Sequence, residues 1–177
     1  MDNCEGCDAR CCRKYLIAVI PSDIERISRK LGAKPADFLQ LFPASECDCV
    51  WAPPFWVDGK ETYVGLKRGK NGCVFLKGVR CSIHAFKPLV CSTFPSCLDG
   101  DRVVVSNACL RKEGWEDEGE RVGIYHSGLA AMRQIAVEWN WKRGNSGSTA
   151  ELFSFLLRHG KEERRISQEV KRFHIPK

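Results

Sequence analysis

The sequence lacks any apolar run long enough to cross a membrane or to act as a secretory signal. Its longest apolar stretches are residues 16–20 and 152–157. A membrane-spanning helix needs about 20 residues, and a signal peptide needs about 7–15 apolar residues near the N-terminus. Residues 1–14 are instead polar and rich in cysteine. We therefore expect no membrane span and a cytoplasmic location, where disulfides are rare.

Several common catalytic motifs are also missing. The sequence has no G-x-G-x-x-G or P-loop for nucleotides, and no H-E-x-x-H or G-x-S-x-G motif. It has no internal repeat and no low-complexity segment. No nucleotide site or hydrolytic centre can therefore be placed. The net charge of +6 is modest, so it permits an acidic partner without requiring one.

Cysteine is what the sequence has in abundance. All 11 cysteines lie within the first 109 residues, and four of them, Cys4, Cys7, Cys11 and Cys12, fall within nine residues. Thiolates bind zinc and iron well, and a short loop can bring several of them to one ion. An odd number of cysteines in a reducing compartment argues against a scaffold made only of disulfides. The pattern favours metal binding.

The spacing within this run points to more than one kind of position. Cys4 and Cys7 are separated by two residues, which is a standard chelating spacing. The neighbouring side chains of Cys11 and Cys12 tend to diverge, so we expect the pair to serve two centres or to include one structural thiol. The basic residues Arg10, Arg13 and Lys14 flank the run, and we expect them to lower its thiol pKa values.

The sequence before Cys109 predicts short elements. Residues 15–20 are a β-branched apolar run that predicts a buried strand. Ser22 and Glu25 have the spacing of a capping box and predict a helix that ends at Gly32. A proline at position 35 predicts a short helix through residue 41.

The same part of the chain predicts a hairpin and further strands. Asp58 and Gly59 separate two short apolar segments, a strong signal for a two-residue hairpin turn. Residues 74–76 and 103–105 resemble short strands.

The sequence after residue 112 predicts helices. Residues 118–142 carry apolar side chains at three- and four-residue steps, which predicts a long amphipathic helix with Trp139 and Trp141 in its packing stripe. Ser148 and Glu151 form a second capping box, and its helix is expected to stop at Gly160.

Together these elements predict an α+β fold. We expect a small, irregular, metal-organised N-terminal region at residues 1–112, with short strands and helices. A helical C-terminal extension, residues 113–177, is expected to pack against it within the same domain.

Three sequence blocks carry a resemblance to a known family. They are CEGCDARCCR, IPSDIERISRKLG and GCVFLKGVRCSIHAFKPLVCSTFPS, at residues 4–13, 20–32 and 72–96. In this order they resemble the YkgJ-type cysteine-cluster family, named for its CxxCxxCC signature, whose domain chelates zinc or iron. The resemblance covers residues 4–109 and implies an iron–sulfur cluster or zinc as cofactor. The metal positions it implies, enough for two four-cysteine centres, are Cys4, Cys7, Cys11, Cys12, Cys73, Cys81, Cys91 and Cys109.

The chain departs from the family pattern at several positions. Lys87 and Ser92 stand where the family has arginine, which removes the bidentate contacts that arginine makes to anions. A family tyrosine is replaced by His84, which makes a formal chelating pair with Cys81 but which we interpret as a surface or hydrogen-bonded residue. The remaining cysteines fall outside the shared blocks and are expected to be dispensable thiols: Cys47, Cys49 and Cys97.

Three classes of function remain open. The favoured class is a cytosolic iron–sulfur or zinc protein whose partners are metal ions and whose role is redox or metal-linked. The second is a zinc-stapled interaction module whose basic residues 158–177 bind an acidic protein or nucleic acid. The third is an enzyme similar to the lysine N-methylases in one branch of the resembled family, although the chain is short and has no glycine-rich methyl-donor loop.

Overall fold

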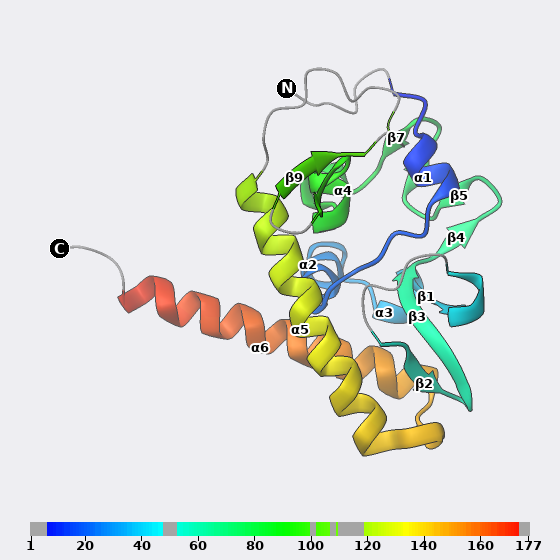
Figure 1. Cartoon of the computed structure of the whole chain (residues 1–177), viewed down its shortest axis with the longest axis vertical. Coiled ribbons are helices and arrows are strands. Elements are labelled where there is room, and N and C mark those ends of the chain that lie inside the picture. Colours follow the sequence, from blue (N-terminus) through cyan, green and yellow to red (C-terminus); the bar gives the residue numbers. More distant parts are fainter. Residues whose placement is uncertain (1–6, 48–52, 100–101, 107–108, 110–118, 174–177) are drawn as a thin grey trace.

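The structure is a computed structural model that describes residues 7–47, 53–99, 102–106, 109 and 119–173 of the 177. Helices and short strands mix along the chain, which confirms the predicted α+β class (Figure 1). The helical elements are α1 (Arg10–Lys14), α2 (Pro21–Leu31), α3 (Pro35–Phe38), η1 (Ala44–Glu46), η2 (His84–Phe86), α4 (Leu89–Thr93), α5 (Gly119–Arg143), η3 (Gly144–Ser146) and α6 (Thr149–Phe173). The strands are β1 (Leu39–Pro43), β2 (Phe55–Val57), β3 (Lys60–Leu66), β4 (Arg68–Gly69), β5 (Gly72–Cys73), β6 (Leu76–Lys77), β7 (Arg80–Cys81), β8 (Ser96–Asp99) and β9 (Arg102–Val105).

The largest sheet has three antiparallel strands in the order β1-β3-β2. The turn between β2 and β3 is the predicted one. Asp58 and Gly59 have φ of 50° and 74°, and two positive φ values are what a type I′ hairpin turn requires.

The expected strand at residues 15–20 is wrong. This segment makes a single bridge, Ala18 to Gly65, and the Leu66 N–H donates to the Ile17 carbonyl at 2.9 Å. Residues 17–20 are nevertheless buried. The β-branched run is therefore apolar because it is buried beside β3, and not because it is a strand. It ends where α2 begins, at Pro21.

Helix α2 begins two residues earlier than the capping box predicted, because its N-cap is Ile20 and not Ser22. Pro21 occupies its first turn, and the Asp23 carboxylate accepts the Ile20 N–H at 3.3 Å. The predicted end is confirmed, because Gly32 follows the helix with φ 63°, the left-handed conformation that suits glycine.

Two other boundaries differ from prediction. Helix α3 ends at Phe38 rather than at residue 41, because Leu39 begins β1 and pairs with Leu66. Residues 74–76 are not a continuous strand but the connection from β5 into β6. The strand predicted at 103–105 is confirmed as part of β9.

The C-terminal helices follow the predicted pattern with one exception. The capping box is confirmed, since the Ser148 N–H donates to the Glu151 carboxylate at 3.0 Å. Helix α6 nevertheless continues through Gly160 to Phe173. A Cβ at Gly160 would lie 2.1 Å from the Pro21 carbonyl oxygen. This glycine therefore permits α6 to cross α2 closely and does not stop the helix.

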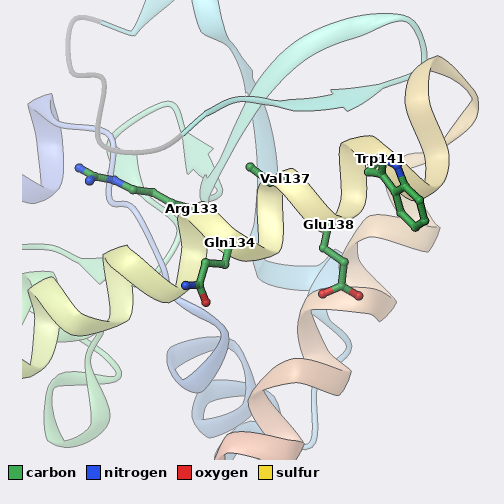
Figure 2. A pocket seen from close by; sticks show the side chains of 5 residues that line it. All are labelled: Arg133, Gln134, Val137, Glu138 and Trp141. Carbon is green, nitrogen blue, oxygen red and sulfur yellow. The ribbon is translucent and has the colours of Figure 1, made fainter.

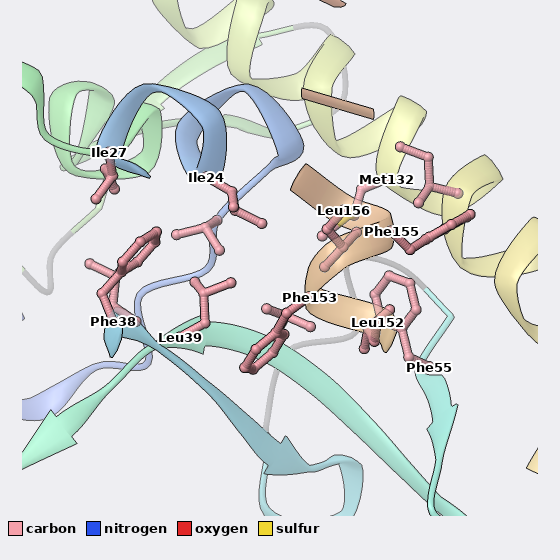
Figure 3. Close-up of a cluster of buried hydrophobic side chains, with 14 of the residues drawn as sticks. Ile24, Ile27, Phe38, Leu39, Phe55, Met132, Leu152, Phe153, Phe155 and Leu156 are labelled. Carbon is pink, nitrogen blue, oxygen red and sulfur yellow. The ribbon is translucent and has the colours of Figure 1, made fainter. Parts of the chain in front are cut away.

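The core lies between α2, the β1-β3-β2 sheet and the helices α5 and α6 (Figure 3). Helix α5 confirms the predicted long helix, and Trp139 is buried and donates its indole N–H to the Trp56 carbonyl at 2.8 Å. Trp141, expected to pack, is instead 83% exposed, because a two-residue step places it on another side of the helix from Trp139. In the part of the chain that is described, no helix has the length and apolar character needed to cross a bilayer.

Candidate metal centre

Two small hairpins place two cysteines in equivalent positions. In the hairpin β4–β5, Arg68 pairs with Cys73, and in the hairpin β6–β7, Leu76 pairs with Cys81. The second hairpin repeats the register of the first, eight residues later. Each cysteine is the last residue of its hairpin, so the short strands deliver two thiols in the same way.

Helix α1 lies directly against the first hairpin and carries Cys11 and Cys12 (Figure 1). Gly72 in β5 has φ 114°, and a Cβ there would lie 2.5 Å from the Cys12 carbonyl oxygen and 2.7 Å from the Arg13 Cα. Only glycine fits both this backbone conformation and this contact. The residue before Cys73 therefore sets how closely α1 approaches it.

Two arginines fasten α1 to the hairpins. The Arg68 guanidinium donates to the Tyr15 carbonyl at 2.5 Å and to the Arg13 carbonyl. The Arg13 guanidinium in turn donates to the Gly78 carbonyl at 2.8 Å, in the turn between β6 and β7. The first pair of bonds satisfies carbonyls at the end of α1, which a helix leaves without internal partners. Both hairpins are thereby joined to one short helix.

The fifth thiol of this region is Cys91, on α4. Its helix is fixed by the buried Asp23 of α2, whose carboxylate accepts the Leu89 N–H at 3.1 Å. Arg26 bonds the same carboxylate at 2.5 Å and the Lys87 carbonyl at 2.9 Å. Helix α2 therefore sets the position of α4. The sequence carries a signal for this link, an Asp and an Arg three residues apart, which sequence reasoning missed.

These five thiols interact electrostatically. Cys11 raises the pKa values of Cys73, Cys81 and Cys91, and burial is the largest cause of the increase at each. The Cys12 thiol donates to Cys11, which lowers the pKa of Cys11 to about 6 and raises that of Cys12. The structure thus brings residues far apart in sequence into one thiol cluster: Cys11, Cys12, Cys73, Cys81 and Cys91.

The expectation that flanking basic residues lower the thiol pKa values needs correction. The pKa of Cys11 is lowered by hydrogen bonds from Cys12 and from the backbone, while the nearby Asp8 opposes the shift. The pKa values of the other four are raised. One physical reason is visible at Arg13, whose guanidinium points to the Asp8 and Gly78 carbonyls.

The other predicted ligands are not brought into this cluster by the described contacts. Cys4 lies outside the described residues, as do Cys49, which we expect to be dispensable, and the side chain of Cys97. Cys7 is half-buried and donates to Asp8 Oδ1 at 3.8 Å.

The two remaining thiols lie in loops. Cys109 is half-buried and donates its backbone N–H to the Ser106 carbonyl at 3.4 Å. Cys47 donates its thiol to the Pro43 carbonyl at 3.4 Å.

In this structure the clustered thiols are not arranged around a common metal position. Among the residues the structure describes, no three Cys, His, Asp or Glu side chains have the arrangement of a metal's ligands. The backbone nevertheless brings five soft donors together from α1, two hairpins and α4. Metal binding at this cluster has to draw thiolates closer together and displace their protons.

His84 and Lys87 form a pair beside the cluster. The Lys87 Nζ lies 2.9 Å from the His84 Nε2. The positive charge of Lys87 lowers the pKa of Cys81, against the larger effect of burial. Lys87, the position where the resembled family has arginine, thus still presents a cation to the thiols.

A surface depression on α5 offers no alternative centre. Figure 2 shows its lining along the outer face of this helix, and none of these residues is a thiol or imidazole: Arg133, Gln134, Val137, Glu138 and Trp141. The thiol cluster therefore remains the candidate site.

The comparisons with known proteins agree with the chemistry of this donor set. The family model "CxxCxxCC: Putative zinc- or iron-chelating domain" matches residues 3–110, more than half of the chain. All five clustered thiols lie within the match. No curated protein and no solved structure matches the chain.

Proposed function

The chain belongs to the family described as "CxxCxxCC: Putative zinc- or iron-chelating domain", and we propose that it is a cytoplasmic metal protein with an iron-based, redox or metal-linked centre. The observation that carries the proposal is the convergence of five thiols from four separate elements. Thiolates are soft ligands suited to zinc and to iron–sulfur clusters.

The proposed ligands divide into two groups. The thiol cluster supplies the first: Cys11, Cys12, Cys73, Cys81 and Cys91. Cys4, Cys7 and Cys109 complete the proposed set of eight, enough for two four-cysteine centres. When bound, an iron–sulfur cluster supplies one-electron transfer at a potential that nearby charge and hydrogen bonds adjust.

The protein's own residues would position and tune these ligands. Arg68 lowers the pKa of Cys73 and Lys87 lowers that of Cys81, although burial outweighs both effects. Both cations therefore favour the thiolate forms that a metal requires. Iron is favoured over zinc because Cys11 and Cys12 are adjacent and both interact with the other clustered thiols. The cluster therefore contains five thiols, one more than a single tetrahedral zinc can bind.

A structural zinc centre is the second candidate, and a specific observation supports it. The hairpins that end in Cys73 and Cys81 share one register and are only two residue pairs long. Short elements of this kind are typical of zinc-stabilised domains, whose folding energy comes from the metal.

Anaerobic purification from iron-replete cells separates these candidates. Stoichiometric iron, acid-labile sulfide and a paramagnetic signal after reduction would support the proposal. Stoichiometric zinc, without iron or visible absorption, would favour the zinc module. Metal-free protein after both iron and zinc reconstitution would contradict both.

Serine variants test the ligand assignment. We expect Cys73→Ser, Cys81→Ser and Cys91→Ser each to lower the metal content. Cys47→Ser is the matched control, because its thiol already bonds the Pro43 carbonyl outside the thiol cluster. Metal loss in the control would refute the assignment, whereas loss in a Cys11 or Cys12 variant would support it.

A further inference from the structure

Positive charge is concentrated around the thiol cluster. We define the cysteine lobe as residues 7–16 and 67–94, which comprise α1, both small hairpins, η2 and α4. These two segments contain nine Lys and Arg and one Asp, a net charge of +8, whereas the whole chain carries +6. The rest of the chain is therefore −2, and the lobe accounts for the basic character of the protein.

A bound metal centre does not neutralise the positive charge of the cysteine lobe. Four thiolates around one divalent ion leave a site charge of about −2. A lobe of +8 would keep a surplus of about +6 with one such centre, and a clear surplus with two. The excess is available to something outside the lobe.

Some of the lobe's cations are occupied internally and others are not. Arg13 and Arg68 donate to backbone carbonyls, and both help to hold α1. Four others make no ion pair or side-chain hydrogen bond among the described residues, and all four are exposed: Lys14, Lys70, Lys77 and Arg80. They lie at the end of α1 and in or beside the two hairpin turns.

These positions form one neighbourhood. Gly72 contacts Cys12 and Arg13, which brings the first hairpin to α1. The Arg13 guanidinium reaches Gly78 in the turn of the second hairpin, between Lys77 and Arg80. In Figure 1, α1, β4, β5 and β7 gather on one side of the molecule, opposite the free end of α6.

Apolar side chains lie within the same surface. Val79, at the tip of the second hairpin, is 56% exposed, and Tyr15 at the end of α1 is 39% exposed. The Tyr15 ring packs against Phe94, with centroids 6.2 Å apart, so it is not a free platform for stacking bases. A protein partner can bury Val79 between basic neighbours, whereas a phosphate backbone gains nothing from it.

We propose that the cysteine lobe is the docking surface for an acidic protein. The partner presents clustered Asp and Glu side chains to Lys14, Lys70, Lys77 and Arg80 and packs an apolar residue on Val79. The inference rests on the proposed function, since it assigns a partner to the face that carries the metal centre. Charge complementarity of this kind steers association and selects the partner.

The test uses the full metal-loaded chain and a fluorescent poly-L-glutamate peptide at low salt. Removing three unpaired lobe cations, in the triple variant K70A/K77A/R80A, is expected to weaken binding about tenfold. The matched control K30A/K34A/K60A removes three exposed charges outside the lobe and should change binding less than twofold. All six positions are outside the core, and melting temperatures verify that both variants fold.

The outcomes are distinct. Equal weakening in both triple variants, or no binding at all, would overturn the docking surface. Tighter binding of an oligothymidylate with the same number of charges would overturn it in favour of nucleic acid. Metal content is measured on every sample: a lobe-specific effect in a chain that takes up no metal would sink the proposed function and leave the acidic docking surface standing.

Discussion

The Asp23 carboxylate accepts the backbone N–H of Leu89 at 3.1 Å, two residues before Cys91. Asp23 is fully buried, and it also accepts the Ile20 N–H and pairs with Arg26. The link runs from α2 to α4 and connects the hydrophobic core to the thiol cluster.

We predict that Asp23→Asn destabilises the protein by about 2–4 kcal/mol, because it removes the charge beside Arg26 and one acceptor for a buried N–H. Thermal unfolding measures this loss. The same variant should release metal to a chelator faster than the parent, because α4 is no longer fixed.

Glu162→Gln is the matched control. This exposed carboxylate pairs with Arg165 on α6, and surface pairs contribute little. Equal metal release in the Asp23 and Glu162 variants would contradict the positioning role.

Gly160 and Gly123 are both inside long helices and should respond oppositely to alanine. A Cβ at Gly160 would lie 2.1 Å from the Pro21 carbonyl oxygen, whereas nothing lies within 4 Å of one at Gly123. Gly160→Ala should cost about 1–3 kcal/mol through overpacking of α6 on α2. Gly123→Ala should stabilise by about 0.5–1 kcal/mol through helix propensity. Denaturant unfolding distinguishes them, and a stabilising Gly160→Ala would show that α6 does not cross α2 at this point.

The glycines also show where prediction from sequence succeeds and fails. Gly32 and Gly59 are required for their own positive φ values, so local sequence patterns were enough to identify a helix end and a hairpin turn. Gly160 is required because it lies against the carbonyl of Pro21, about 140 residues away in the chain. A local sequence pattern cannot predict such a contact. Glycine therefore ends one helix at position 32 and permits close packing of another at position 160.

At the thiol cluster, too, some residues were predicted from the sequence and others were not. Sequence spacing and family resemblance identified Cys73, Cys81 and Cys91 as candidates, because the cysteines themselves carry the pattern. The supports of the cluster were missed: they are Gly72 against α1 and Asp23 beneath α4. These depend on tertiary contacts between segments that are each too short to reveal their partners.

The metal-free protein should contain one unusually reactive thiol. The pKa of Cys11 is about 6 because Cys12 donates to its thiolate, so its alkylation by iodoacetamide should reach a plateau above about pH 7. Burial raises the pKa values of Cys73 and Cys91, and their alkylation should still be increasing at pH 9. Mass spectrometry of labelled peptides resolves each site.

Removing the donor provides the test of cause. Cys12→Ala should move the Cys11 midpoint up toward an ordinary thiol pKa of about 8.5. The folded-state pKa of Cys11 is lower than its unfolded value, so its stabilising contribution is complete above that unfolded value and is lost as pH falls through 6. As the control, Cys47→Ala should leave the pH dependence of Cys11 alkylation unchanged. If Cys12→Ala also left it unchanged, the hydrogen bond from Cys12 would not be the cause of the low pKa of Cys11.

Chelation should release the cysteine lobe before the main core. The two hairpins are closed by the Val74 and Ser82 N–H groups, which donate to the Lys67 and Phe75 carbonyls at 2.8 Å. Strands of two residues bury too little to offset the entropy of ordering them. Metal binding to such a region is also folding energy, so its removal should increase hydrogen exchange at these two amides strongly.

The main core provides the internal control for that measurement. The Leu66 N–H donates to the Ile17 carbonyl at 2.9 Å, beside a core that α5 and α6 complete. Its protection should persist after chelation because most of that core is built from apolar side chains of α2, the β1-β3-β2 sheet, α5 and α6, which lie outside the cysteine lobe. Reloading zinc or iron should restore protection at Val74 and Ser82. Exchange that is unchanged at these amides, in protein shown to have lost its metal, would mean that the hairpins hold their structure by packing alone.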